Sequence, residues 1–236
     1  MTSSIIDRLR QDLMANVDAK TQASAQYYFK EAITAYGVTV PKVNAISKTY
    51  FGEVKQLDKS VAWALCETLW QSGMLEESFV ACHWSYALSD RFEPDDFAVF
   101  EQWVQRYVSN WASCDTLCNH TIGALVERYP VFLENLKVWT ASENRWVRRA
   151  SVVSLIIQAR KGLFLSEVFD LAERLLTDTD DLVQKGYGWL LKAASQAHQE
   201  AVFQFVMDHK ATMPRTALRY AIEKMPPTLK AEAMKK

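Results

Sequence analysis

The sequence predicts an all-α protein. Gly and Pro are scarce, at 7 and 6 of 236 residues, and runs of alternating β-branched residues are almost absent. Apolar residues recur instead at the spacing of one helix face along nearly the whole chain. The apolar fraction, 49%, is enough to form a sizeable core. We therefore expect a single helical domain that covers residues 1–236.

The predicted helices begin and end at recognisable signals. The first, within residues 3–17, follows a serine cap. A second runs from Val61 to Gly73, because glycine favours the backbone conformation that ends a helix. Two further helices begin near Pro94 and Pro130, since proline suits the first helical turn. Short polar turns join these helices, and no segment has the composition of a linker.

The second half of the chain contains an internal repeat. Residues 144–160 align with residues 181–196 after a shift of 36, and residues 213–225 form a weaker third copy. The shift places Arg149 on Lys185. Repeats of this length are typical of stacked helix pairs of the HEAT or armadillo kind. We therefore predict a right-handed α-α superhelix of HEAT-like (armadillo-type) repeats.

Stacked helix pairs of this kind form a concave face, along which equivalent residues line up. Arg149 and Lys185 would then be neighbours, and Arg215 or Arg219 would continue the row. The charge distribution agrees. Residues 1–136 carry 11 Lys and Arg against 17 Asp and Glu, and the remaining residues carry 16 against 11. We expect a concave basic face, although charges scattered over solvated helix faces would give the same asymmetry.

The sequence lacks the common catalytic motifs. It contains no glycine-rich phosphate loop, no HExxH zinc motif and no GxSxG nucleophile motif. Cys114, Cys118 and His120 lie close in sequence, but their spacing does not form a tetrahedral metal site. We expect no metal and no cofactor. The four cysteines are expected to be reduced and mostly buried.

Trp111 and Asp115 are four residues apart on a predicted helix and therefore share one face. An exposed acid beside a half-buried indole would have the same spacing, so this pair alone leaves both interpretations open. Gly186 and Gly188 lie inside a predicted helix beside Trp189. Because glycine costs about 1 kcal/mol there relative to alanine, something must approach the backbone closely. That partner is either a neighbouring helix or a ligand.

Four motifs together resemble the DNA alkylation repair family of HEAT-like glycosylases. A tryptophan, three residues and an aspartate are matched by Trp111 and Asp115. The stretch "ENRWVRR" places the family arginine at Arg149, and "QKGYGW" places a second tryptophan at Trp189. A tyrosine before a Gly-to-Pro turn selects Tyr28. The similarity spans residues 20 to 225.

The resemblance implies a monofunctional DNA glycosylase that excises N3- or N7-alkylated, positively charged purines from duplex DNA. Asp115 is then the catalytic carboxylate, and Trp111 and Trp189 contact the cationic nucleotide. Arg149 holds a phosphate near the lesion. Further DNA or lesion contacts are assigned to Tyr28, Lys185 and Arg148. The base is released and the strand is left uncut.

Two alternatives use the same fold without chemistry. One is a non-catalytic DNA-binding protein, and the other is a protein-binding scaffold, which the acidic stretch from Glu53 to Glu101 would favour. The chain has no apolar run of about 20 residues, and its first 20 residues lack the regions of a signal peptide. We expect a cytoplasmic monomer whose partner is double-stranded DNA, with no membrane contact.

Overall fold

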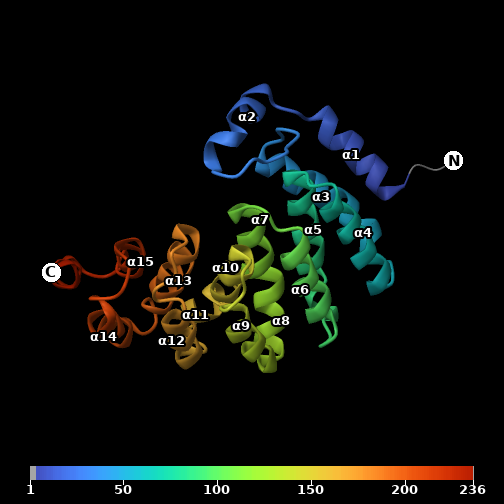
Figure 1. Ribbon diagram of the computed structural model, residues 1–236. Helices are drawn as coiled ribbons and strands as arrows, with labels where there is room; N and C mark the ends of the chain where they lie inside the picture. Colours follow the sequence, from blue (N-terminus) through green and yellow to red (C-terminus); the bar gives the residue numbers. More distant parts are fainter. Residues whose placement is uncertain (1–3, 236) are drawn as a thin grey trace. The chain divides into compact units, whose positions relative to one another are not determined.

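The computed structural model describes residues 4–235, and the regular structure within them is helical (Figure 1). Helices account for 72% of the chain. Apart from an isolated bridge between Thr34 and Met74, the described residues form no β-structure. The predicted all-α class is confirmed. Within the same residues, no helix combines the length and the apolar character needed to cross a membrane.

The chain divides into two compact units, Met1–Leu117 and Cys118–Lys236. The α-helices of unit 1 are α1 (Ile5–Ala15), α2 (Ala19–Ser24), α3 (Val40–Val54), α4 (Lys59–Gln71), α5 (Leu75–Ala87), α6 (Asp96–Arg106) and α7 (Trp111–Thr116). Short 3₁₀ segments occupy Ala25–Tyr28 and Ser89–Arg91. That both units form one domain, with a superhelical curvature and a concave basic face, stays a prediction.

Local signals place the first helices where the sequence predicts them. Ser4 caps α1 in a reciprocal capping box, in which its hydroxyl accepts from Asp7 N and the Asp7 carboxylate accepts from Ser4 N. Gly73 follows α4 with φ +69°, the left-handed conformation that glycine adopts without strain. Buried residues of α1 and α3 pack the two helices together.

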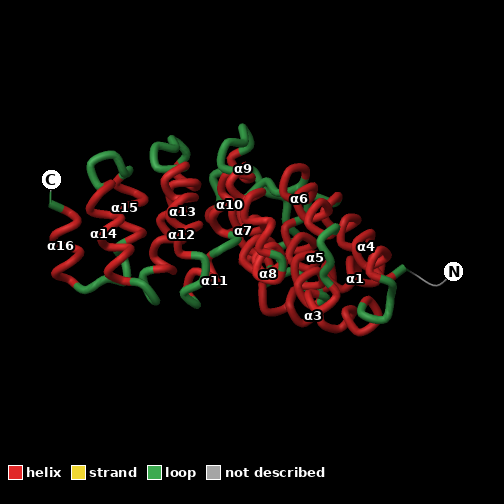
Figure 2. Tube along the Cα trace, turned by 90° about the horizontal axis from the view of Figure 1, so that it is seen from below, coloured by secondary structure: helices red, strands yellow, loops and turns green. Residues whose placement is uncertain are grey.

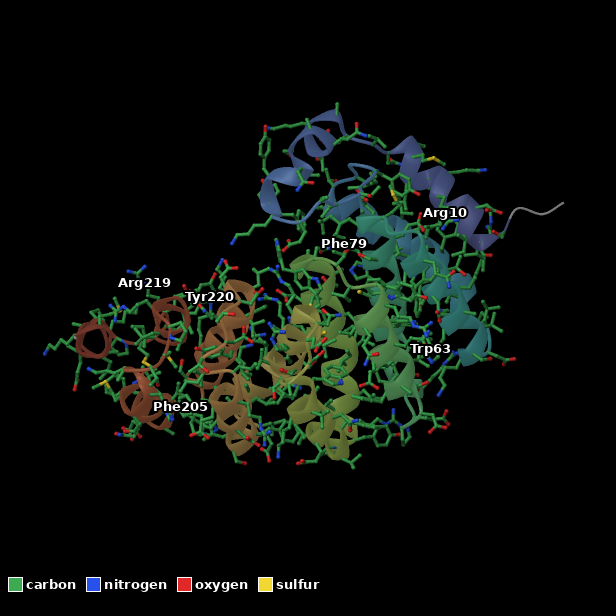
Figure 3. The ribbon with its side chains drawn as sticks, viewed as in Figure 1. Arg10, Trp63, Phe79, Phe205, Arg219 and Tyr220 are labelled. Atoms are coloured by element: carbon green, nitrogen blue, oxygen red, sulfur yellow. The ribbon has the colours of Figure 1, made fainter. Side chains whose placement is uncertain are left out.

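The core of unit 1 contains a cluster of aromatic rings around Trp63 (Figure 3). Its ring centroid is 5.4 Å from Phe100 and 6.2 Å from Trp103, both edge-to-face, as aromatic quadrupoles prefer. Asp96 accepts hydrogen bonds from Trp63 Nε1 at 2.7 Å and from Glu93 N at 2.8 Å. These bonds start α6 at Asp96, two residues later than the proline suggested.

Unit 2 contains the remaining helices. They are α8 (Gly123–Arg128), α9 (Leu133–Trp139), α10 (Arg145–Val153), α11 (Ile156–Arg160), α12 (Leu165–Arg174), α13 (Asp181–Ala194), α14 (Gln199–His209), α15 (Arg215–Ala221) and α16 (Pro227–Met234). A 3₁₀ turn, Pro130–Phe132, precedes α9, so the predicted helix at Pro130 begins as a tighter turn. Helix α13 packs against α10, α12 and α15, which makes it the centre of this unit.

The described chain consists of helices joined by loops (Figure 2). Six of these helices begin at a regular interval in the sequence, and we call them the repeat helices. They are α3, α5, α7, α10, α13 and α15, and their N-caps are 34–36 residues apart, at Thr39, Met74, Asn110, Asn144, Asp180 and Pro214. We number positions in each repeat helix from its N-cap. The regular interval extends the repeat that the sequence showed only in its second half.

The predicted shift of 36 residues is seen in the hydrogen bonds of unit 2. Asn144 accepts from Trp146 N at 2.9 Å, and Asp180 accepts from Leu182 N at the same distance. Arg148 donates to Ser142 O at 2.9 Å, and Gln184, its counterpart, donates to Asp178 O at 2.8 Å. The two helix starts are therefore built alike, although their side chains differ in charge.

The two glycines inside α13 are explained by helix packing. A Cβ on Gly186 would lie 3.2 Å from Val152 Cγ2 on α10. A Cβ on Gly188 would lie 2.7 Å from the backbone oxygen of Ala217 and from Tyr220 Cβ on α15. Of the two partners that the sequence left open, the structure shows the neighbouring helix.

We expect Gly188→Ala to destabilise the protein. The added methyl meets backbone on α15, so overpacking costs about 1–3 kcal/mol and outweighs the gain in helix propensity. A matched control is Gly52→Ala in α3, where a Cβ would meet nothing within 4 Å. That change should raise stability by about 0.5 kcal/mol. Urea unfolding midpoints measure both, and a stabilised Gly188→Ala protein would contradict the close α13–α15 packing.

Candidate functional site

Helix α7 presents the predicted catalytic pair. Asn110 caps the helix by accepting from Ser113 N at 3.0 Å. Trp111 and Asp115 are half-buried, whereas Ser113 and Cys114 between them face the core. The pair therefore shares the accessible side of the helix, and the Asp115 carboxylate is not sealed inside unit 1.

A widened turn follows Asp115 directly. Residues Leu117–Ile122 form a π-helix before α8 begins at Gly123. Such π-turns are rare and occur frequently at functional sites. It was not predicted from the sequence, because one widened turn is too short to change the apolar periodicity of the helix around it.

Two aromatic residues from the N-terminal segment hold Trp111. Its Nε1 donates to Tyr28 O at 3.1 Å, and its ring stacks on Phe29 with centroids 5.4 Å apart and planes inclined by 22°. Tyr28 was predicted from the sequence and Phe29 was not. The run of three aromatic residues at 27–29 could have indicated both. The Tyr28 side chain itself is 71% exposed, so its backbone, not its ring, contacts Trp111.

A pocket of about 240 Å³ lies beside Trp111 in unit 1. Its walls are mostly apolar and come from the N-terminal segment, α5 and α7. They include Tyr28, Phe29, Val38, Phe79 and Trp111. Phe79, labelled in Figure 3, comes from the accessible side of α5. The pocket can take an apolar or aromatic group next to the Trp111 indole.

Two buried acids at the start of α5 anchor the segment that forms this pocket. Glu76 accepts from the backbone N–H groups of Tyr36, Gly37 and Val38 at 2.8–3.0 Å. Gly37 adopts φ +90°, and a Cβ there would lie 2.4 Å from Gln22 Cβ, so only glycine fits this turn. The hydrogen bonds from Glu76 thus fix the start of the turn that was predicted between Gly37 and Pro41.

The neighbouring acid, Glu77, is fully buried and holds two more groups. It accepts from Arg10 Nε at 3.0 Å and Nη2 at 2.9 Å, and from the Tyr36 hydroxyl at 2.6 Å. The hydrogen bonds to Glu77 raise the pKa of Arg10. Burial, together with the bond to Glu77, raises the pKa of Tyr36. Arg10, labelled in Figure 3, therefore links α1 to the start of α5 and, through Glu77, to Tyr36.

The predicted arginines of α10 are engaged within unit 2. Arg148 donates to Asp178 Oδ2 at 2.7 Å and to two backbone oxygens before the helix, those of Ser142 and Glu143. Arg149 is 5% exposed and donates through Nη1 to Leu182 O on α13. Both side chains therefore contribute to packing α10 against the following repeat. Their predicted contacts with DNA stay predictions.

Lys185 and Trp189 lie on α13 at positions 5 and 9 and are both half-buried. Lys185 forms an ion pair with Asp181 at 3.2 Å, one helical turn earlier. Arg219 is the position-5 residue of the next repeat helix, α15, beside Tyr220 (Figure 3). It is exposed and forms no ion pair with any residue that the structure describes.

The cysteines have no features of a reactive or metal-binding site. All four are buried free thiols, as the sequence predicted. Burial raises the pKa of Cys66 and of Cys82, which keeps both thiols neutral at physiological pH. Among residues 4–235, no group of three or more His, Cys, Asp or Glu side chains is arranged to hold a metal ion.

The seven predicted site residues are distributed over both units. Unit 1 holds Asp115, Trp111 and Tyr28, of which the last two are in direct contact. Unit 2 holds Arg148, Arg149, Lys185 and Trp189, all on α10 and α13, which pack together. Their joint role at one lesion stays a prediction.

Comparisons with known proteins agree with this architecture. A structure described as a predicted DNA alkylation repair enzyme from Enterococcus faecalis has a TM-score of 0.80 and 20% sequence identity. The similarity covers 90% of this chain and 98% of that one, which shows a common fold. No match was found among curated proteins. The model of the family described as DNA alkylation repair enzyme matches residues 9–225. Because this match covers most of the sequence, the chain belongs to the DNA alkylation repair enzyme family.

Proposed function

We propose that the protein is a monofunctional DNA glycosylase that releases positively charged N3- or N7-alkylated purines from duplex DNA. One observation carries this proposal. In a chain of the DNA alkylation repair enzyme family, a carboxylate and an indole, those of Asp115 and Trp111, share the accessible side of one short helix. A DNA substrate follows from membership of this family, and the finer specificity is our inference.

The reaction requires little chemistry from the protein. In an N3- or N7-alkylated purine the base is cationic, so it departs with the electron pair of the C1′–N bond and becomes neutral. Positive charge then develops on the sugar, and the Asp115 carboxylate stabilises that charge electrostatically. A water molecule held by the same carboxylate adds its oxygen to C1′ and loses a proton to solvent. The products are the free base and an abasic site in an uncut strand.

The aromatic residues recognise the charge of the lesion. Trp111 offers its indole to the cationic nucleotide, and such cation–π contacts contribute about 0.5–2 kcal/mol. Phe29 stacks on the Trp111 ring and Tyr28 O accepts its N–H, so the indole is fixed before DNA binds. Trp189 is assigned a similar contact from unit 2. The exposed Tyr28 ring is assigned to the strand beside the lesion.

The basic residues bind the phosphates. Arg149 is assigned the phosphate next to the lesion, because a guanidinium carries five N–H donors in a planar fork that matches the oxygens of a phosphate. Lys185 adds charge at the same position of the next repeat helix. Arg148 is assigned a supporting contact, since Asp178 holds its guanidinium firmly in place.

Release of 7-methylguanine or 3-methyladenine from methylated duplex DNA tests the proposal. The intact protein should release at least one of these bases well above the spontaneous rate, without cleaving the strand. Salt-sensitive binding of the duplex with no base release would support the alternative of a non-catalytic DNA-binding protein. Absence of both duplex binding and base release would support the alternative of a protein-binding scaffold.

Arg219→Gln is expected to weaken binding to any duplex, whatever its sequence. Arg219 is exposed and forms no ion pair among the described residues, so its charge is available to a phosphate. Losing one phosphate contact should reduce the slope of log K against log salt concentration by about 1. Arg160→Gln at the end of α11 removes another exposed charge, 16 residues after Asn144, the N-cap of α10, and serves as the control. Equal slopes for both variants would show that Arg219 does not contact a DNA phosphate.

A further inference from the structure

A second pocket, of about 270 Å³, opens between α3 and α5 in unit 1 and is not used by the site described above. Helix α3 contributes Asn44, Lys48 and Phe51 to its lining. Helix α5 contributes His83, Trp84 and Tyr86. The pocket therefore combines aromatic walls with an amide and an ammonium group.

The polar groups of this pocket differ in how they are satisfied. The Trp84 Nε1 donates to Ser47 O at 3.0 Å, so its indole presents only apolar surface to the space. The Oδ1 atom of Asn44 is buried and has no hydrogen-bond partner within the described chain. A buried acceptor without a partner costs about 1–3 kcal/mol, which a ligand with an N–H donor would recover.

The side chains at the mouth are accessible. Tyr86 is 44% exposed although its ring is large and apolar. Lys48 is exposed, one helical turn after Asn44, and forms no ion pair within residues 4–235. A ligand that fits must therefore be flat and aromatic, must carry an N–H donor, and must be negatively charged at one end. A nucleotide has all of these properties.

The repeat register gives a second reason for a nucleic acid, which follows from the proposed function. Asn44 occupies position 5 of α3, as Asp115 and Arg149 do in their own repeat helices. His83 occupies position 9 of α5, the position of Trp189 in α13. The pocket is thus lined by residues at the same register positions to which the proposed function assigns DNA contacts in other repeat helices.

We propose that this pocket binds one unpaired nucleotide of a DNA strand. The base lies against the exposed Tyr86 ring, over Trp84, which lines the pocket but is only 1% exposed. One N–H group of the base donates to Asn44 Oδ1, and a neighbouring phosphate pairs with Lys48. The choice of DNA as the partner rests on the proposed function. Base release is not part of the inference, and no bond is made or broken in the pocket.

Binding to two unmodified duplexes tests the inference, one fully paired and one with a single bulged adenine. The intact protein should bind the bulged duplex about fivefold more tightly, because stacking one base on aromatic side chains contributes to affinity on this scale. Tyr86→Ala and Asn44→Leu should abolish the preference and leave the affinity for the paired duplex unchanged. Val61→Ala, an exposed apolar truncation on α4, should keep the preference.

The role of the Lys48 charge is tested with substitutions on α3. Lys48→Gln should weaken binding of the bulged duplex more than that of the paired one, whereas Lys55→Gln, at the exposed end of α3, should not discriminate between them. Photo-crosslinking from a bulged 5-iodouracil should place the adduct on α3 or α5. The inference is overturned if the intact protein shows no preference, if the variants weaken both duplexes equally, or if the adduct lies elsewhere.

These outcomes are separate from the outcome of the base-release assay, because the duplexes carry no alkylated base. If the protein prefers the bulged duplex but releases no base, the pocket inference is supported and the proposed glycosylase activity is contradicted. If the protein releases bases but does not prefer the bulged duplex, the proposed activity is supported and the pocket inference is contradicted.

Discussion

Replacing Asp115 with asparagine should lower the rate of base release by about 10²–10³-fold, the usual effect of removing one electrostatic group that acts on the transition state. Asparagine has nearly the same shape and can still orient a water molecule, but it cannot stabilise positive charge on the sugar. The loss should therefore appear in the single-turnover rate at saturating protein. Binding of the methylated duplex should change little, since the charge develops only as the bond breaks.

A control separates this loss from a folding defect. Asp58→Asn makes the same chemical change at the exposed N-cap position of α4, where the aspartate side chain makes no capping bond. It should leave the single-turnover rate unchanged. The thermal unfolding midpoint of Asp115→Asn should match that of the intact protein, because Asp115 is only half-buried. Base release at the normal rate by Asp115→Asn would show that this carboxylate has no catalytic role.

The largest loss of stability is expected for Glu77→Ala, at about 3–5 kcal/mol, the range for breaking a buried ion pair. Three hydrogen bonds disappear at once, two from Arg10 and one from the Tyr36 hydroxyl. Both partners are left partly buried without an acceptor, and desolvation of Arg10 is then uncompensated. Guanidinium chloride unfolding of the intact protein and the variant gives the difference.

The pair Arg8–Glu53 provides a matched comparison within the same unit. Arg8 also makes two hydrogen bonds to its acid, at 3.0 and 2.6 Å, but the Glu53 side chain is 51% exposed. Glu53→Ala should therefore lower the stability far less than Glu77→Ala does, because exposed ion pairs contribute little. If the two variants were equally stable, burial would not be the reason that Glu77 matters, and the anchoring of the N-terminal segment would need another explanation.

Much of the helical framework could be predicted from the sequence because its signals are local. The Ser4 capping box, the left-handed Gly73 and the 36-residue shift each depend on residues close together in the chain. The shared face of Trp111 and Asp115 follows from helix geometry in the same way. None of these features requires knowledge of which helices meet.

Other features depend on contacts between distant residues, and the sequence does not indicate them. Phe29 is 82 residues before Trp111, and Glu77 is 67 residues after Arg10. The burial of Arg149 was also unforeseen, because an arginine beside a predicted concave face would normally be assigned to solvent. Its partner, Leu182 O, is a backbone carbonyl oxygen, and every residue carries one. The sequence therefore does not indicate which carbonyl a buried arginine will bind.

The hydrogen bonds from α10 to the following repeat have a consequence for how unit 2 opens. Arg148 reaches Asp178, and Arg149 reaches Leu182, so each tie extends only to the adjoining helix pair. At α15 the N-cap is Pro214, whose side chain makes no capping bond. Local opening should therefore start at the C-terminal pair and progress inward, and amide hydrogen exchange should be fastest in α15 and α16 and slowest in α13.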